Sequence, residues 1–149
     1  LTQIQQGMLG SPVAGNGPAF SASGGTTTAA SGWSKLPINT KVFDTANCYD
    51  ASTNYRFTPN VAGYYQITGN AAINSTGSNP SSVFIQIYKN GSVAKSNSGS
   101  NAGGGFASSV TGVIYMNGTT DYLGFTCYSS TALTVGSGAG VVFSIYKVG

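Results

Sequence analysis

The sequence predicts an all-β domain, a sandwich of ten short strands. Short runs of alternating apolar and polar residues recur between clusters of Gly, Asn, Ser and Thr, a spacing typical of two stacked antiparallel sheets. Asn-Gly pairs at 90–91 and 117–118 favour tight hairpin turns, because both residues tolerate a positive φ angle. No stretch keeps a helical periodicity. The predicted strands cover residues 19–22, 33–38, 40–43, 55–59, 63–73, 82–89, 92–95, 106–116, 121–128 and 140–147.

The segment before the first strand differs from the rest of the chain. Residues 1–18 contain four Gly and two Pro among a few apolar residues, a composition that argues against a stable helix. We expect a linker or stalk here; the alternative is a short collar packed against neighbouring chains through Leu1, Ile4, Met8 and Leu9. Residues 19–149 form one domain, because a chain of 149 residues is long enough for one core of this kind but not for two.

Alternation within the strands separates a core face from an outer face. Apolar residues recur at every second position of the strands at 82–89 and 121–128, so one face of each strand is assigned to the core. The predicted core residues are Phe57, Tyr65, Ile67, Val83, Ile85, Ile87, Leu123, Phe125 and Cys127. The opposite faces are rich in Tyr, whose apolar ring and polar tip suit contacts between subunits. The predicted subunit interface consists of Tyr88, Tyr122, Thr126 and Tyr128.

Charge and hydropathy exclude two classes of partner. The six basic residues are scattered and no two are adjacent, whereas affinity for the phosphates of nucleic acid requires clustered cations. No apolar stretch approaches the roughly twenty residues that span a bilayer. We therefore expect neither nucleic-acid binding nor membrane insertion.

The side chains needed for catalysis are nearly absent. The sequence has no His and no Glu, and its only carboxylates are those of Asp44, Asp50 and Asp121. General acid–base chemistry and an activated nucleophile both lack their usual partners, so the protein is predicted not to be an enzyme and to need no cofactor. Cys48 and Cys127 are expected to be reduced, with a single disulfide as the alternative. The glycine pattern at 99–105 indicates a flexible hairpin tip within 97–105, since no Gly-Lys-Ser/Thr ending follows it.

One region resembles a known family. Tyr49-Asp50, Thr53 and Phe57, followed by the run Gly63-x-Tyr65-x-Ile67, resemble the signature region of complement C1q-type globular domains, relatives of the tumour necrosis factor jelly roll. The similarity extends from Pro18 to the C-terminus. It implies a ten-stranded jelly-roll sandwich that assembles as a homotrimer. Some C1q-type domains bind Ca²⁺, for which Asp44 and Asp50 are the candidate ligands, but turn capping is the favoured role of these two residues.

The amino-acid sequences of several segments resemble the C1q-like domains of bacteriophage structural proteins more closely than those of animal proteins. These segments are 17–22, 54–59 and 62–65, with Trp33 between the first two. The resemblance implies the head domain of a tail fibre or similar virion appendage, assembled in the host cytoplasm with other virion proteins and binding a host-surface glycan or protein. A decoration (cement) protein that stabilises the particle is the first alternative, and a secreted C1q-like recognition module is the second.

Recognition residues are expected on the long polar connections at 21–32, 74–81 and 97–105, because binding residues concentrate on loops held by a rigid scaffold. The candidate ligand-binding residues are Thr26, Trp33, Ser78, Asn79, Ser98 and Asn101. For Trp33, which precedes Leu36 and Ile38, packing within the domain is the alternative role.

Overall fold

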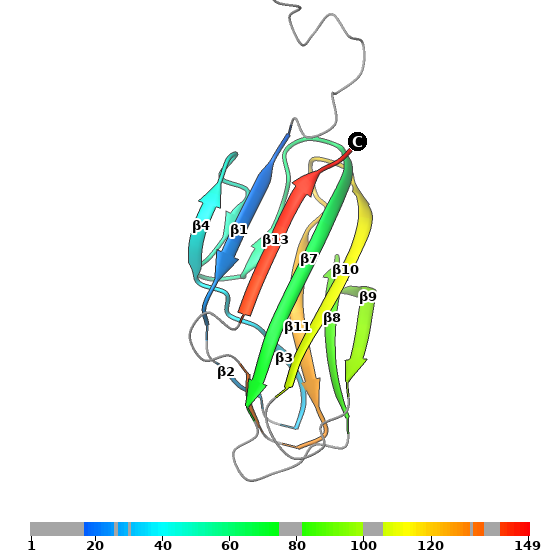
Figure 1. Cartoon of the computed structure of the whole chain (residues 1–149). Helices are drawn as coiled ribbons and strands as arrows, with labels where there is room; N and C mark the ends of the chain where they lie inside the picture. The colour runs from blue at the N-terminus through cyan, green and yellow to red at the C-terminus, as the bar shows by residue number, and fades with distance from the viewer. Residues whose placement is uncertain are drawn as a thin grey trace, which may run out of the picture.

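The computed structural model describes residues 17–25, 27–29, 31–74, 82–99, 106–131, 133–135 and 141–149, and in these residues it contains strands and turns but no helix able to span a membrane. Figure 1 shows the strands stacked in two layers. The strands are β1 (Ala19–Ser23), β2 (Thr27–Ala29), β3 (Gly32–Lys35), β4 (Thr40–Asp44), β5 (Tyr49–Asp50), β6 (Arg56–Phe57), β7 (Gly63–Asn74), β8 (Val83–Lys89), β9 (Ser92–Gly99), β10 (Phe106–Met116), β11 (Leu123–Ser129), β12 (Leu133–Val135) and β13 (Val141–Lys147).

The strands form two antiparallel sheets that pack as a jelly-roll sandwich. The seven-stranded sheet, called sheet A here, has the order β2-β12-β7-β13-β1-β4, and β10 pairs along the other edge of β7. The six-stranded sheet B has the order β5-β6-β11-β8-β9, and β3 pairs with the later part of β11. Strand β11 therefore has β8 on one side and both β6 and β3 on the other. The predicted all-β jelly-roll sandwich is confirmed.

Every predicted strand overlaps an observed one, and the differences concern ends and short additions. The short strands β2, β5 and β12 were not predicted. The strand predicted over 33–38 ends at Lys35, because Pro37 has no N–H to donate to a ladder. Strand β9 was expected to end at residue 95 but continues to Gly99, since Asn97, Ser98 and Gly99 pair with the first residues of β8. The expected hairpin tip at 97–105 therefore starts later, and residues 100–105 lie outside the described part, as do residues 1–16 of the expected linker.

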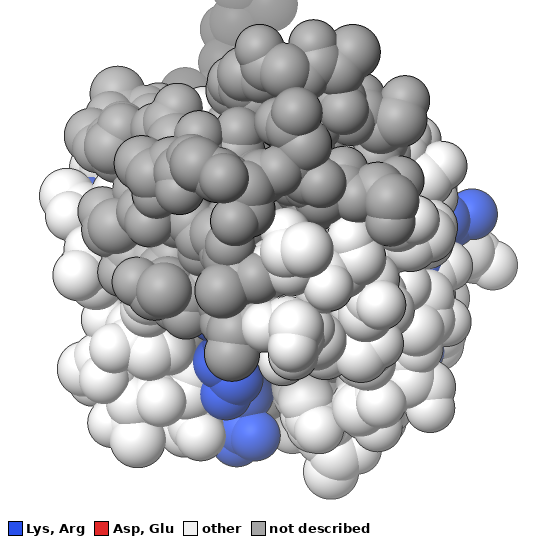
Figure 2. Space-filling view, turned by 90° about the horizontal axis from the view of Figure 1, so that it is seen from below, with Lys and Arg blue, Asp and Glu red and all other residues white. Residues whose placement is uncertain are grey.

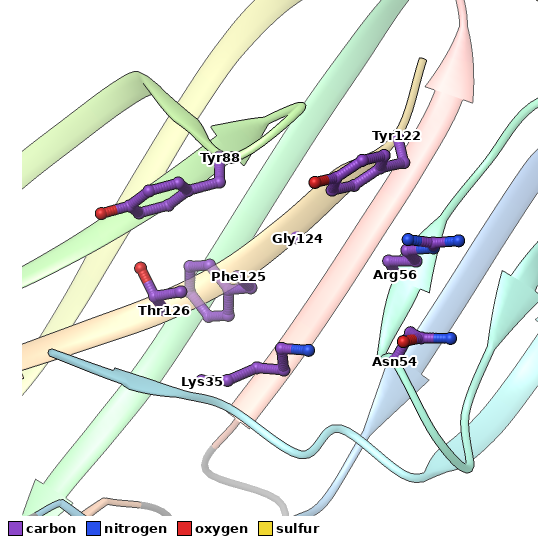
Figure 3. Close-up of a pocket in the computed structure, with 9 residues that line it drawn as sticks. Lys35, Asn54, Arg56, Tyr88, Tyr122, Gly124, Phe125 and Thr126 are labelled. Carbon is purple, nitrogen blue, oxygen red and sulfur yellow. The ribbon is translucent and has the colours of Figure 1, made fainter. Parts of the chain in front are cut away.

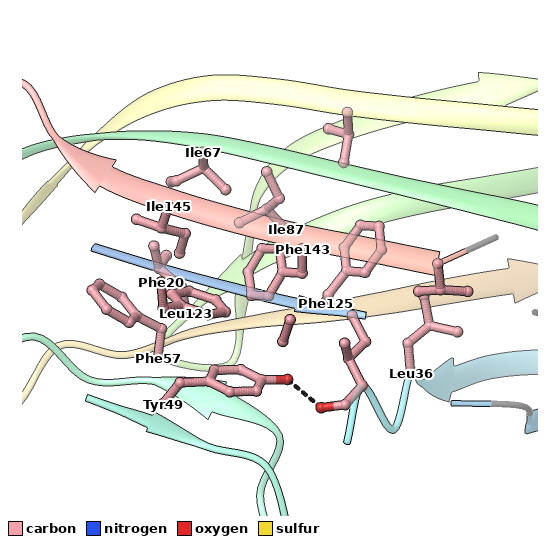
Figure 4. Close-up of a cluster of buried hydrophobic side chains, with 14 of the residues drawn as sticks. Phe20, Leu36, Tyr49, Phe57, Ile67, Ile87, Leu123, Phe125, Phe143 and Ile145 are labelled. Atoms are coloured by element: carbon pink, nitrogen blue, oxygen red, sulfur yellow. Dashed lines mark hydrogen bonds between the residues drawn. The ribbon is translucent and has the colours of Figure 1, made fainter. Parts of the chain in front are cut away.

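The core fills the space between the sheets, and all nine predicted core residues are buried. Its centre is aromatic: the ring of Phe20 stacks on Tyr49 at 4.4 Å and on Phe57 at 5.0 Å between ring centroids. The rings of Phe125 from sheet B and Phe143 from sheet A stack at 5.3 Å (Figure 4). The polar tip of Tyr49 at this centre is satisfied, because its hydroxyl donates to the carbonyl of Ile38 at 2.8 Å.

The two Asn-Gly turns differ. Asn90 and Gly91 both have positive φ angles, 52° and 83°, as predicted for the hairpin between β8 and β9. At the second pair only Gly118 has a positive φ, so the prediction of the same turn there is wrong. The side chain of Asn117 decides the difference. Its Oδ1 accepts hydrogen bonds from the backbone N–H groups of Thr119, Thr120 and Asp121 and folds the chain into a side-chain-capped turn.

Candidate binding site

The outer face of sheet B carries an aromatic cluster. The ring of Tyr128 lies 5.0 Å from that of Trp33 and 5.7 Å from that of Phe84, and Trp33 also approaches Tyr88 at 6.5 Å. Strands β3, β8 and β11 supply these side chains, which point away from the core. Trp33 remains half exposed although it packs on its neighbours. Both predicted roles of Trp33, ligand binding and packing within the domain, are therefore compatible with its position.

Beside this cluster, β11 forms the floor of a groove of about 190 Å³. We call it the β11 groove, and it is lined by Lys35, Asn54, Arg56, Tyr88, Gly91, Tyr122, Gly124, Phe125 and Thr126. Gly124 explains the hollow, because it is paired with Arg56 of β6 on one side and Tyr88 of β8 on the other. A Cβ added at Gly124 would meet no atom within 4 Å. The missing side chain leaves open space between larger neighbours, as Figure 3 shows.

Tyr122 is fixed at one end of the β11 groove by the turn between β8 and β9. The backbone N–H of Tyr122 donates to Oδ1 of Asn90 at 2.9 Å, and the N–H of Asn90 donates to the Tyr122 carbonyl at 3.1 Å. The side chain of Asn90 also donates to Asp121 at 2.7 Å, and Asp121 forms an ion pair with Lys89 at 2.8 Å. The Asn-Gly turn, the strongest local signal in the sequence, thus holds one wall of the groove.

The opposite wall depends on Asp50. Its carboxylate accepts hydrogen bonds from the backbone N–H groups of Ser52, Thr53 and Asn54 at 2.9–3.0 Å. These bonds, led by that of Thr53, lower the pKa of Asp50. The same carboxylate accepts from Nδ2 of Asn54 at 3.0 Å, so the amide of Asn54 is held at the groove. Next to it the Arg56 guanidinium lies 4.6 Å from the centre of the Tyr122 ring, a cation–π contact.

The carboxylates cap turns, as the favoured interpretation predicted. Asp44 accepts hydrogen bonds from the backbone N–H groups of Cys48 and Tyr49 at 2.9 and 3.0 Å and forms an ion pair with Lys41 at 3.0 Å. Burial alone would raise the pKa of Asp44, but these bonds outweigh it and the pKa is lowered. Asp50 is occupied in the same way. Within the described ranges no group of three His, Cys, Asp or Glu side chains could hold a metal ion.

The two thiols are free and buried, as expected for reduced cysteines. Burial raises the pKa of Cys127 to about 11 and also raises that of Cys48. A thiol is nucleophilic only as the thiolate, so neither side chain is set up for covalent chemistry at neutral pH.

The predicted subunit-interface residues do lie together. Tyr88, Tyr122 and Thr126 line the β11 groove, and Tyr128 belongs to the aromatic cluster next to it. The predicted ligand-binding residues are more dispersed. Ser98 lies on strand β9, where it pairs with Phe84, and not on a loop. Thr26, Ser78, Asn79 and Asn101 lie outside the described residues.

Sequence reasoning missed a second surface, the outer face of sheet A. Five exposed large apolar residues occupy it, each close to half exposed: Phe43, Tyr64, Val113, Tyr115 and Tyr146. Tyr64 of β7 pairs with Tyr115 of β10, and their rings are 5.4 Å apart. Lys147 is the single charged residue of β1, β7, β10 and β13, and it is buried. The signal for this surface in the sequence is weak, because the outward positions of β7 and β10 are mostly polar or small apart from Tyr64, Val113 and Tyr115.

Comparison with known proteins shows similarity in structure but not in sequence. No protein-family model and no curated protein matches the chain. A crystal structure of murine APRIL at pH 5.0 superposes with a TM-score of 0.70 and 9% identity, covering 89% of this chain and 100% of APRIL. The vertex protein P5 of phage PRD1 superposes with a TM-score of 0.62 and 16% identity, covering 89% of this chain and 97% of P5. This chain has the TNF-like jelly-roll fold.

The TNF-like fold agrees with the coarser part of the resemblance found in the sequence. At 9–16% identity the superpositions establish the fold alone. The surface adds one further property. Seen from the end opposite the C-terminus, the described surface is mostly uncharged, with isolated basic side chains and no acidic one in view (Figure 2).

The ionisable groups predict that the free energy of unfolding is nearly constant around neutral pH. The pKa of each of Asp44, Asp50 and Asp121 is lowered in the folded state, so their contributions are present above the unfolded value of about 3.9 and are lost as the pH falls through the folded values. Burial raises the pKa of Tyr65 to about 12 and that of Cys127 to about 11. These two groups contribute stability at pH values below their unfolded-state pKa values, about 10 and 8.5. That stability is lost as the pH rises through their folded-state pKa values.

With no His and no Glu in the sequence, the free energy of unfolding is expected to change little between about pH 5 and pH 8 and to fall on both sides. Urea unfolding monitored by circular dichroism across pH 3 to 11 measures this profile. A step in the free energy of unfolding near pH 6.5 contradicts the predicted profile.

Proposed function

We propose that the chain is a non-enzymatic virion domain, the trimeric head of a tail fibre or similar appendage that binds a host-surface glycan or protein. The observation that carries this proposal is the superposition on a phage vertex protein over nearly the whole of both chains. The resemblance of 17–22, 54–59 and 62–65 to C1q-like domains of phage structural proteins supports it independently. The lack of His and Glu and the burial of both thiols favour a binding role over catalysis.

The outer face of sheet A is the proposed trimer interface. Large half-exposed apolar side chains lie on this face, on which β1, β7, β10 and β13 expose no charge, and such a face is typical of one that is covered in the assembled protein. The outward-facing tyrosines of sheet A are about half exposed, with Tyr64 at 55% and Tyr146 at 51%, whereas the predicted interface residues Tyr88, Tyr122 and Tyr128 are already partly buried within one chain. The interface predicted from the sequence, on sheet B, stays a prediction, and the two faces can be tested against each other.

Labelling of intact particles tests the virion role. Gold-conjugated antibodies against this domain are applied to particles purified from cells that carry the gene, and the particles are imaged by electron microscopy. Label at the tips of fibres or other appendages is expected. Label spread over the capsid shell favours a decoration protein, and particles that contain no label contradict a virion role.

A further inference from the structure

We propose that the β11 groove binds one acidic sugar residue of a surface glycan. The sugar ring packs against the rings of Tyr88 and Tyr122, and its carboxylate faces the cations Lys35 and Arg56. This inference names the ligand class and moves the binding site from the loops to a sheet face. It depends on the proposed attachment role for its biological purpose, but the binding itself is a property of the isolated domain.

The charges at the groove select an anion. The described ion pairs join Lys41 to Asp44 and Lys89 to Asp121, so Lys35 and Arg56 have no acidic partner in the described part of the chain. No carboxylate lines the groove. An incoming anion therefore meets two cations without displacing an existing ion pair. A carboxylate suits this site better than a dianionic phosphate, because burying the second negative charge of the phosphate in a small groove costs additional free energy.

The walls and the size of the groove select a small ring. Tyr88 and Tyr122 flank Gly124, and a Tyr ring offers an apolar face to the C–H groups of a sugar and a hydroxyl to its edge (Figure 3). The volume of about 190 Å³ is below the roughly 300–1,000 Å³ of sites for drug-sized ligands. The groove therefore accommodates about one sugar ring, and the rest of the glycan extends into solvent.

The side chain of Asn54 favours a ligand with hydroxyl groups over a bare carboxylate. Because Nδ2 of Asn54 donates to Asp50, the carbonyl oxygen of the same amide is left to accept a hydrogen bond from a ligand. The hydroxyl of Thr126 is enclosed beneath the groove surface, so it contributes no contact to the ligand. Carboxylate, hydroxyl groups and an apolar ring face occur together in uronic and sialic acid residues.

The groove stays open in the proposed assembly, since the trimer interface on sheet A is on the other side of the sandwich. Three copies then present three grooves, and avidity raises the affinity for a repeated surface glycan above that of each weak site.

Titration calorimetry with defined sugars tests the site on the purified full chain. The probes are trigalacturonic acid and 3′-sialyllactose, with methyl-esterified trigalacturonate and lactose as the uncharged controls. We expect at least one acidic probe to bind. Its uncharged counterpart is expected to bind at least about tenfold more weakly, because it lacks the charge-assisted hydrogen bonds. Equal binding of acidic and uncharged probes overturns the charge assignment. Failure of both acidic probes, or binding of a poly-glutamate peptide alone, overturns the sugar assignment.

Substitutions at the β11 groove test whether the sugar binds there. Gly124→Leu fills the groove without removing a binding group, and Lys35→Gln with Arg56→Gln removes both charges; each is expected to weaken binding at least tenfold. Lys95→Gln is the matched control, because Lys95 is exposed, lies on β9 and does not line the groove. If Gly124→Leu fails to fold, the charge variant decides alone. Unchanged binding in the charge variant places the sugar elsewhere and overturns the proposal, whereas particle labelling tests the virion role separately.

Discussion

Replacing Phe125 with Ala is expected to lower the free energy of unfolding by about 3–5 kcal/mol, the usual cost of removing a buried aromatic ring. The side chain is 1% exposed and stacks on Phe143 of the opposite sheet. Its ring also lies against the backbone of Gly69, where an added Cβ would fall within 2.5–2.7 Å of ring carbons. A cavity at Phe125 thus removes contacts across both sheets. Urea unfolding monitored by circular dichroism, at one fixed protein concentration, measures the loss.

Phe84→Ala is the matched control for this prediction. Phe84 is a partly buried ring of the same size on the outer face of the neighbouring strand β8, and its loss is expected to cost clearly less. Gly69→Ala adds a complementary test from the other side, because the new methyl group would collide with the Phe125 ring. A larger cost for Phe84→Ala than for Phe125→Ala contradicts the assignment of the two faces.

Local patterns in the sequence predicted most of the fold. Alternation identified Leu123, Phe125 and Cys127 as core residues because each sheet has one dry face, and residue i+2 returns to that face. The hairpin at 90–91 was predictable because its φ angles need residues of this type. The short strands β5 and β12 were not, since two or three residues carry no periodicity and pair only because their neighbours are already in place.

The β11 groove shows why a binding site is harder to predict. Its two cations, Lys35 and Arg56, are far from Gly124 in the sequence and join it only through the pairing of β3 and β6 with β11. Tyr88 and Tyr122 were recognised as outward-facing tyrosines, but they were assigned to contact between subunits. An outward Gly within a strand of alternating large residues was the one local signal of a hollow, and its meaning depends on the side chains across the sheet.

Tyr146→Lys is expected to convert the proposed trimer to monomers at micromolar concentration. Tyr146 is on β13 and has Ala19 of β1 and Gln66 of β7 as its cross-strand neighbours, so a Lys here stands near the middle of the proposed interface. Association would bury one uncompensated charge per chain, and each costs several kcal/mol. Because Tyr146 is exposed in the single chain, the fold itself should persist, with an unchanged circular dichroism spectrum. Light scattering after gel filtration measures the mass against the 15.1 kDa of one chain.

Tyr128→Lys separates the two candidate faces, because it places the same charge on the outer face of sheet B, where the sequence pattern alone locates the interface. If sheet A forms the trimer, Tyr128→Lys keeps the trimeric mass, since its new charge stays in solvent. Dissociation by Tyr128→Lys but not by Tyr146→Lys assigns the interface to sheet B, and the β11 groove beside Tyr128 would then be covered in the assembly. A wild-type chain that remains monomeric at micromolar concentration contradicts the homotrimer on either face. The mass of these two variants therefore also decides whether the sugar site is accessible in the assembled protein.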